Sequence, residues 1–341
     1  MNERVMMKHG AGGRAMRALI EEIFVRGAPD GLPTGSVGLA AMDDGAAIPL
    51  GDGRWLVITT DSHVISPIFF PGGDIGRLAV SGTVNDLAMM GATSVLALTC
   101  AVILEEGFPW AELERVQASL RATCKEAAAP IVTGDTKVMG RGEIDGIVLN
   151  TTGVAITDRV VRDSGLRAGD RVVVTGTLGD HGMAVMATRH ALGLEGNLRS
   201  DVAPIGSMIA HVLARHGAAV TAMKDPTRGG LASALSEMAQ KSGVGVVLDY
   251  AALPVTDEVR AAAELLGVDP LVVANEGKAV LGVRAEDADA VVATLREHPL
   301  GRNAAIVGTC TGERPGALVL DTGFGRRLVT EPEGELLPRI C

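Results

Sequence analysis

Alternating and helical patterns of hydrophobic residues divide the first half of the chain into strands and helices. Strands are predicted at Ala46–Leu50 and Arg54–Thr60, joined by a turn at Gly51-Asp52-Gly53. Apolar residues then recur at helical spacing from Asp74 to Met90, and again on one face from Trp110 to Ala128. Segments rich in β-forming residues predict three further strands, at Ser94–Ile103, Ile131–Val138 and Ile144–Ile156.

The second half begins after a polar, glycine-containing stretch, residues 158–170, which we interpret as a linker. Helical and strand patterns then alternate. The predicted strands are Arg171–Val174, Gly245–Asp249, Lys278–Val283 and Ala305–Cys310. The predicted helices are Val202–Arg215, Gly230–Lys241, Thr256–Leu266 and Glu286–Arg296. We therefore predict an α+β protein with domains at 1–157 and 171–330 and a C-terminal tail at 331–341.

Composition restricts the classes of function. Hydrophobic residues make up 47% of the 341 residues but aromatic residues only 2%, so the cores must be built from aliphatic side chains and Met. A net charge of −10 without a basic run gives no attraction to nucleic-acid phosphates. The sequence contains no membrane-length apolar run, no signal core and no disulfide or zinc pattern among its scattered cysteines. We expect a reduced, cytoplasmic protein that binds neither nucleic acid nor membrane.

Carboxylates flank the predicted hairpin. Asp43 and Asp44 precede its first strand and Asp61 follows its second, so counting outward from the turn brings them to about the same level. Crowded carboxylates repel unless protons or a cation intervene, and Mg²⁺ bound together with substrate phosphates suits such a group. Aspartates that merely serve as turn residues explain the hairpin equally well.

Further polar residues occur at other element ends. Asn85 and Asp86 interrupt an apolar helix, and Asp135 ends a predicted strand two residues before Lys137. Asp225 opens a predicted helix whose N-terminus is a natural anion site. Glu276 lies in a loop before a strand, where a solvated carboxylate is the usual case.

Two glycine-rich segments are candidate phosphate-binding loops. His9-Gly-Ala-Gly-Gly-Arg14 contains Gly12 and Gly13 and precedes a predicted helix at Ala15–Phe24. Thr175-Gly-Thr-Leu-Gly-Asp-His-Gly182 follows a strand and contains Gly179, Asp180 and His181. Neither segment has the ending of a Walker A loop or the full dinucleotide fingerprint. His181 is a candidate acid or base, although a structural, hydrogen-bonded histidine is the more frequent case.

The chain ends in a thiol, Cys341. A thiol is a nucleophile, and a tail is able to carry it to another site. Taken alone, a chance surface cysteine is the favoured explanation.

Together these segments resemble one family. Asp43-Asp-Gly-Ala-Ala, Thr60-Asp-Ser-His, Val84-Asn-Asp-Leu-Ala, Gly134-Asp-Thr-Lys, Lys224-Asp-Pro-Thr-Arg-Gly-Gly, Asn275-Glu-Gly-Lys and the ending Pro338-Arg-Ile-Cys occur in order. The set resembles the HypE family of hydrogenase maturation proteins, the carbamoyl dehydratases, from His9 to Cys341. The acidic segments are shared with a wider ATP-using superfamily that includes aminoimidazole ribonucleotide synthetase, selenophosphate synthetase and thiamine-phosphate kinase. The terminal Pro-Arg-Ile-Cys is specific to HypE.

The resemblance implies a homodimer in which the N-terminal sheet pairs with that of a second subunit, beside a C-terminal α/β layer. It implies that ATP lies in the cleft and that Mg²⁺ is held by Asp44, Asp61, Asp86 and Asp225, with Asp43 as a further candidate. The other residues that it assigns to the nucleotide or its surroundings are Gly12, Gly13, Asn85, Asp135, Gly179, Asp180 and His181.

The resemblance also implies a mechanism. The carbamoyltransferase HypF delivers a carbamoyl group to Cys341, ATP phosphorylates the oxygen of that group, Lys137 polarises the phosphate or the carbonyl, and Glu276 removes protons. The resulting thiocyanate would pass its cyanide to iron held by the HypC–HypD complex. The alternatives are a selenophosphate synthetase-like enzyme, for which the loop at residues 9–14 lacks the reactive cysteine, and a nucleotide-binding assembly scaffold.

Overall fold

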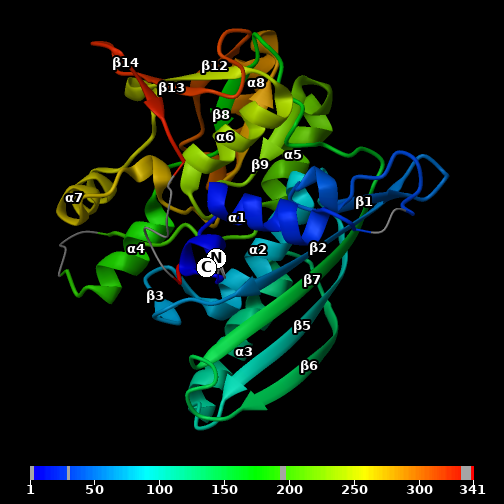
Figure 1. The fold of residues 1–341 in the computed structure, drawn as a ribbon, viewed down its shortest axis with the longest axis vertical. Helices are drawn as coiled ribbons and strands as arrows, with labels where there is room; N and C mark the ends of the chain where they lie inside the picture. Colours follow the sequence, from blue (N-terminus) through cyan, green and yellow to red (C-terminus); the bar gives the residue numbers. More distant parts are fainter. Residues whose placement is uncertain (1–3, 29–30, 193–196, 332–338) are drawn as a thin grey trace.

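A five-stranded sheet forms the N-terminal half of the computed structural model, which describes residues 4–28, 31–192, 197–331 and 339–341. The strand order is β1-β2-β7-β5-β6, and every neighbouring pair is antiparallel except the parallel pair β5 and β6 (Figure 1). The strands are β1 (Ala46–Pro49), β2 (Trp55–His63), β5 (Val95–Glu105), β6 (Ile131–Met139) and β7 (Ile147–Thr157).

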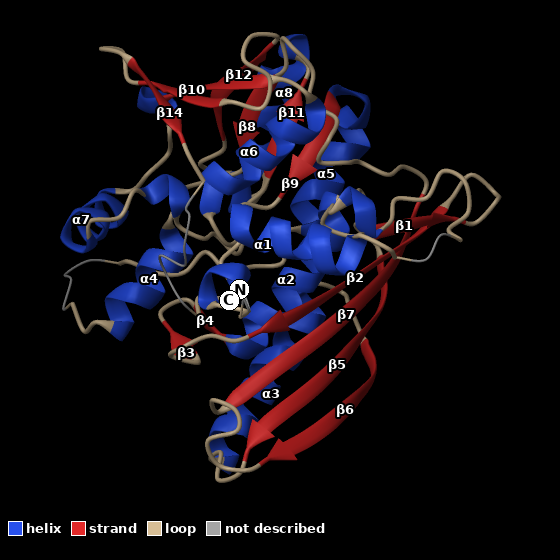
Figure 2. Cartoon of the chain, viewed as in Figure 1, coloured by secondary structure: helices blue, strands red, loops and turns tan. Residues whose placement is uncertain are grey.

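Two helices, α2 (Ile75–Met89) and α3 (Trp110–Glu126), cover one face of this sheet. Along β7 buried and half-buried residues alternate strictly, which is the pattern of a strand with one face in the core. The side chain of Asp74 caps α2 by accepting the backbone N–H of Arg77. Nearly every residue of α2 is buried, because this helix lies between the sheet and the C-terminal half (Figure 2).

A seven-stranded sheet forms the C-terminal half, in the order β14-β13-β10-β12-β8-β11-β9. Its strands are β8 (Arg171–Val174), β9 (Val220–Lys224), β10 (Gly245–Asp249), β11 (Val280–Val283), β12 (Ala305–Thr311), β13 (Leu318–Asp321) and β14 (Arg326–Val329). Val172 and Val174 pack with α6 (Gly230–Ser242), whereas Val173 packs on the other face with α5 (Gly206–His216) and α8 (Ala288–Glu297). This sheet is therefore covered by helices on both faces.

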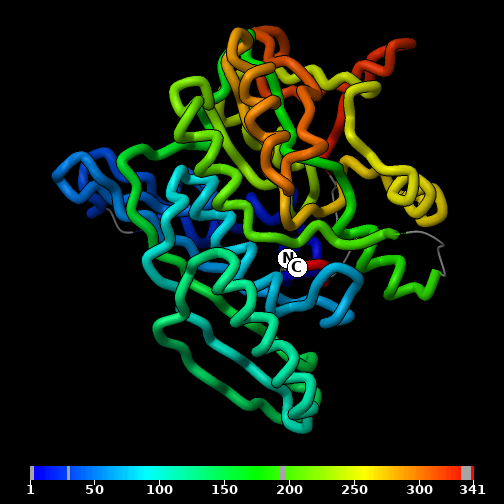
Figure 3. Tube along the Cα trace, turned by 180° about the vertical axis from the view of Figure 1, so that it is seen from behind, coloured from blue at the N-terminus to red at the C-terminus, as the bar shows by residue number. Residues whose placement is uncertain are grey.

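The remaining elements lie mostly around the junction of the two halves. They are α1 (Arg14–Leu19), α4 (Asp180–Arg189), α7 (Asp257–Leu266), the small strands β3 (Phe69–Phe70) and β4 (Gly73–Asp74), and short 3₁₀ turns. Seen from behind, the C-terminal residues run between the two halves (Figure 3). Residues 158–170, all of which are described, contain no helix or strand.

The α+β class predicted from the sequence is confirmed, and so are the hairpin and the two long N-terminal helices. The helix predicted at Ala15–Phe24 is only partly right, because the α-helix ends at Leu19 and a π-helical segment continues at Ile20–Val25. No sequence pattern predicted α4, β9, β13 or β14. Within the described residues, no helix is long and apolar enough to cross a membrane.

Candidate active site

A cavity of about 750 Å³ is lined by residues from both halves of the chain. Its polar lining includes four aspartates from the N-terminal half and a lysine, an arginine and two carboxylates from the C-terminal half, together with the terminal cysteine. These residues are Asp43, Asp44, Asp61, Asp86, Lys224, Asp225, Arg228, Glu276 and Cys341. Of the residues expected in the site, seven therefore surround one cavity.

The hairpin positions the first of these aspartates. Ala46 pairs with Ile58, and two further steps in that register bring Asp44 level with Thr60. The Thr59 hydroxyl then links the hairpin to α2, since its Oγ1 lies 2.9 Å from Asp86 Oδ2 and 3.0 Å from the Asp44 carbonyl oxygen. The expected proximity of the carboxylates on either side of the hairpin is confirmed by the cavity that they share.

Burial and mutual repulsion raise the pKa values of several of these carboxyls. The pKa of Asp86 is raised well above its usual range by burial, and then by the charges of Asp61, Asp225 and Asp44. The pKa of Asp225 is raised for the same reasons, although Lys224 opposes the shift. Burial, followed by Asp163 and Asp44, raises the pKa of Asp43 to about 7.

Lys224, which no sequence pattern singled out, is the main positive charge on one wall of the cavity. Its Nζ forms an ion pair with Asp44 and lies 3.6 Å from Glu237 Oε2 and 3.7 Å from Asp163 Oδ2. Burial alone lowers the pKa of Lys224, but these three carboxylates outweigh it and raise the pKa well above its ordinary value. A second lysine, Lys241, lies 2.5 Å from Asp163 Oδ2, so Asp163 is doubly neutralised.

Glu276 is held by a loop in which close backbone approach is required. The Glu276 N–H donates to Asp201 Oδ1 at 3.2 Å, and a Cβ at the next residue, Gly277, would lie 1.9 Å from the Asp201 carbonyl oxygen. Among the described residues, Glu276 Oε1 is buried without a hydrogen-bond partner. Burial first, and then Asp225, raises the pKa of Glu276 well above its usual range.

The terminal thiol lies in this cavity with Glu276 and Arg228. Burial raises the pKa of Cys341 far above that of an ordinary thiol, and Arg228 opposes the shift. Cys341 in turn is the largest influence on Arg228, whose pKa is raised. The thiol therefore rests in its neutral form. Residues 332–338 of the expected tail lie outside the described residues, and of the described residues 339–341 Cys341 lines the cavity.

Two expected site residues, Asp135 and Lys137, do not line the cavity. Both lie on β6, an edge strand whose side chains are all exposed, and Lys137 Nζ lies 3.5 Å from Asp135 Oδ2. The strand itself was predicted correctly. Because β6 lies at the outer edge of the sheet, next to β5, its side chains do not reach the cavity of this chain.

Asn85 and the second glycine-rich segment are also outside the cavity lining. Asn85 is buried and hydrogen-bonds the backbone of the C-terminal half. The Gly179 N–H donates to Asn275 Oδ1 at 2.7 Å, and Asp180 accepts a hydrogen bond from Thr177. His181 contacts the tail, since its Nε2 lies 2.7 Å from the Ile340 carbonyl oxygen. This segment is therefore not part of the cavity lining, and its place beside the nucleotide stays a prediction.

The first glycine-rich segment lies beside the cavity. Gly12 lines an adjoining space of about 110 Å³ together with Arg228, and Gly13 is the N-cap of α1. Gly12 has φ +76°, and a Cβ there would come within 2.5 Å of Arg228 Cβ, so only glycine fits.

No group of three or more His, Cys, Asp or Glu side chains within the described part of the chain is arranged so as to hold a metal ion. The aspartates nevertheless face a common space, and the buried Asp44 Oδ2 has no hydrogen-bond partner there. Oxygen ligands of this kind are the ones that Mg²⁺ prefers.

Both halves of the chain match the domains of one known protein family. Residues 42–157 match the N-terminal domain of AIR synthase related proteins, and residues 167–321 match the C-terminal domain. The chain is therefore a member of this two-domain family.

Individual relatives place the chain in one group within this family. The carbamoyl dehydratase HypE of Cupriavidus necator is 47% identical over 341 residues, covering 99% of this chain and 95% of the relative. The HypE of a crystallised HypE–HypF complex superimposes with a TM-score of 0.84 at 40% identity, over 92% of this chain and 100% of that one. A HypE crystallised with ATP gives a TM-score of 0.80 at 38% identity, over 99% and 100%. The chain belongs to the HypE family of carbamoyl dehydratases.

Proposed function

We propose that this chain uses Mg·ATP to dehydrate an S-carbamoyl group on Cys341 to a thiocyanate, the source of the cyanide ligand of [NiFe]-hydrogenase iron. The observation that carries the proposal is the position of the Cys341 thiol in the acidic cavity, beside Glu276 and Arg228. The tail thus brings its own substrate group to the carboxylates, and Cys341 acts as a carrier.

The reaction balances without a redox partner. The carbamoyl oxygen attacks the γ-phosphorus of ATP, ADP leaves, and one N–H proton is lost. The C–O bond then breaks, inorganic phosphate departs with that oxygen, and loss of the second N–H proton completes the C≡N bond. The sulfur–carbon bond to Cys341 remains intact throughout, so the product stays attached to the tail.

Glu276 is the proposed base for the N–H protons. It lies at the same cavity as Cys341, and its interaction raises the pKa of the thiol. The raised pKa of Glu276 makes its ionised form a stronger base than an exposed glutamate. Arg228 supplies positive charge next to the sulfur and offsets the surrounding carboxylates.

Asp44, Asp61, Asp86 and Asp225 are the proposed ligands of Mg²⁺, with Asp43 as a further candidate. Neighbouring carboxylates repel one another and so help to raise the pKa values of Asp86 and Asp225. A bound cation would relieve this repulsion. Bound Mg²⁺ would neutralise charge on the transferred phosphoryl group. Asp44 would exchange its ion pair with Lys224 for the metal, and the lysine would then offer its positive charge to the phosphates.

The proposed partners follow the family. A relative was crystallised with HypF, which we propose as the donor of the carbamoyl group here, and the HypC–HypD complex as the acceptor of the cyanide. We propose a cytoplasmic homodimer that pairs along the exposed edge strand β6.

Intact-mass spectrometry tests the function directly. Incubation with HypF, carbamoyl phosphate and ATP should add a carbamoyl group to the chain, and the carbamoylated form should then lose one water in an ATP-dependent step. Cys341→Ala should do neither, whereas Cys124→Ala, which removes a half-buried thiol from α3, should behave as the wild type. Dehydration in the Cys341→Ala chain would disprove the assignment. Carbamoylation without ATP-dependent loss of water would instead favour a scaffold.

A further inference from the structure

We propose that His181 and Arg189 are positioning residues that form a seat for the tail and hold Cys341 in the cavity. The inference rests on the proposed function, because it assigns the seat a role in aligning the carbamoyl group with Glu276. Both residues belong to α4, the helix that opens in the second glycine-rich segment.

A chain of hydrogen bonds sets the tautomer of His181. The Ile340 carbonyl oxygen is able only to accept, so His181 Nε2, 2.7 Å away, carries the ring proton and donates to it. In the neutral ring Nδ1 is then an acceptor. The Ser200 hydroxyl therefore donates to Nδ1 at 2.8 Å while its Oγ accepts the Val202 N–H at 3.0 Å. Burial lowers the pKa of His181 and keeps the ring in this neutral form.

Arg189, in the last turn of α4, binds the backbone of Arg339, the residue before Ile340. Its Nη2 donates to the Arg339 carbonyl oxygen at 2.8 Å and to the Ser66 carbonyl oxygen at 2.6 Å. The Ser66 N–H donates to the same Arg339 oxygen at 3.2 Å. The planar guanidinium therefore ties the tail to the segment after β2 through two backbone carbonyls.

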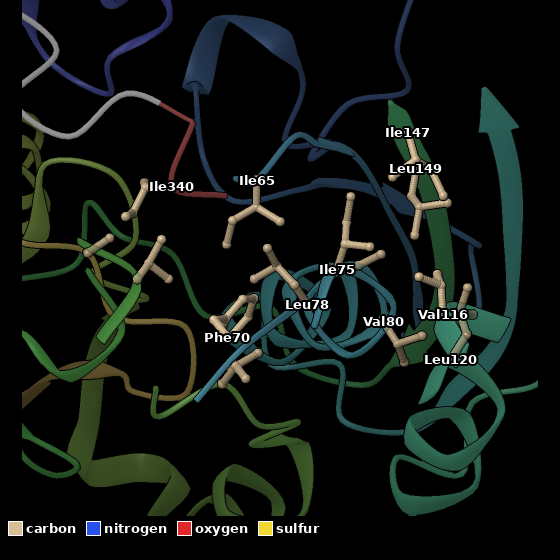
Figure 4. Close-up of a cluster of buried hydrophobic side chains, with 14 of the residues drawn as sticks. Ile65, Phe70, Ile75, Leu78, Val80, Val116, Leu120, Ile147, Leu149 and Ile340 are labelled. Atoms are coloured by element: carbon tan, nitrogen blue, oxygen red, sulfur yellow. The ribbon is translucent and has the colours of Figure 1, made fainter. Parts of the chain in front are cut away.

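Ile340 supplies the apolar part of the seat. Its side chain is buried in the cluster that contains Ile65 and Phe70 (Figure 4). The Phe70 ring packs edge-on against the His181 ring, with centroids 5.4 Å apart and planes at 88°. The same pocket thus fixes both the Ile340 side chain and the imidazole that binds its carbonyl group.

The seat leaves the reacting atom available. His181 and Arg189 bind the backbone of Ile340 and Arg339, while the thiol faces Glu276 and Arg228. Arg339 has φ +53°, a left-handed conformation that a non-glycine residue keeps only where surrounding contacts determine it. Its side chain pairs with Asp145. This turn directs the last two residues inward.

Thiol alkylation of the full-length protein tests the seat without requiring turnover. We expect His181→Leu and Arg189→Leu to increase the iodoacetamide reaction rate of Cys341 about tenfold, which corresponds to losing one hydrogen bond of ordinary strength. His181→Gln keeps an N–H donor and should restore protection. The matched controls are His211→Leu, at a half-exposed histidine away from the tail, and Arg302→Leu, at an exposed arginine. Wild-type alkylation rates in both leucine variants would refute the seat.

The buried thiols of Cys100 and Cys310 report folding in the same experiment. If His181→Leu exposes these two thiols, that variant has lost its fold. The test then rests on Arg189→Leu, with Arg189→Lys as the conservative variant for comparison. Single-turnover dehydration should fall in the leucine variants while ATP affinity is unchanged, and His181→Gln should recover it. Equal dehydration in wild type and variants would refute positioning. An alkylation change in a protein whose wild type never dehydrates would support the seat and refute the proposed function.

Discussion

Asn85 and Glu276 belong to different halves of the chain, yet Asn85 Nδ2 lies 3.3 Å from the backbone carbonyl oxygen of Glu276. The same amide donates to the Ala203 carbonyl oxygen at 3.1 Å, and its Oδ1 accepts the Ile205 N–H at 2.8 Å. Helix α2 is therefore bonded to the loop that carries the proposed base, and Asp86 on that helix is the neighbouring residue. One buried amide aligns the two walls of the cavity.

Asn85→Leu should destabilise the fold and lower dehydration together. The substitution leaves the Ala203 carbonyl and the Ile205 N–H unpaired, and a buried unsatisfied group costs about 1–3 kcal/mol. We expect a loss of roughly 2 kcal/mol or more in the free energy of unfolding, measured in urea. Asn150→Leu, which removes a half-exposed amide from β7, should cost much less. Equal losses would argue against the interdomain bond.

Lys224→Met should be strongly destabilising at neutral pH. It leaves the buried carboxylates of Asp44 and Asp163 with less compensation, and breaking a buried pair costs about 3–5 kcal/mol. The loss should shrink near pH 5, because burial raises the pKa of Asp44 and its carboxyl takes up a proton more readily as the pH falls. Urea unfolding at both pH values measures the difference, with the exposed Lys8→Met as control. A loss that does not depend on pH would contradict the electrostatic explanation.

Local patterns were enough to predict part of this site. Counting from a tight turn predicted that Asp44 and Asp61 would be neighbours, because a hairpin fixes its own register. Helical spacing of apolar residues placed Asp86 on a helix but did not say which way it faced. Its inward direction depends on Thr59, from the hairpin that packs on α2.

Contacts between distant segments were not predictable. Lys224 meets Asp44 across 180 residues, and no periodicity marks a lysine for such a pair. His181 lies in a segment that the sequence suggested as a phosphate-binding loop. Its hydrogen-bond partner in the structure is the backbone of Ile340, and a backbone contact leaves no side-chain signal in a sequence. Lys137 lies on a strand that was correctly predicted, but its distance from the cavity follows from strand order.

Mg·ATP binding should tighten as pH rises from 6 to 8. Burial raises the pKa values of Asp86 and Asp225, and it raises that of Asp43 to about 7, so protons compete with the metal for these carboxyls. Binding therefore releases protons, and higher pH favours it. Calorimetry in buffers of different ionisation enthalpy measures the number released. Binding that does not vary over this range would contradict the proposed ligands.

Asp86→Asn should reduce both the affinity for Mg·ATP and the number of protons released. The amide keeps the shape of the carboxyl and its contact with Thr59, so the fold should remain intact. Asp52→Asn, at the exposed hairpin turn, is the matched control. Normal calorimetric binding in Asp86→Asn would remove this residue from the metal site.

Lys137 should act on the second copy of a homodimer. Every side chain of β6 is exposed, and Lys137 does not line the cavity of its own copy, so pairing along this edge is the way for it to approach a cavity. We expect Lys137→Ala to lose dehydration, with the exposed Lys8→Ala unaffected. Mixed dimers of Lys137→Ala and Cys341→Ala subunits should then regain activity, because one cavity in each dimer combines an intact tail with an intact lysine. Purified mixed dimers that stay inactive in the intact-mass assay would show that Lys137 does not act between copies.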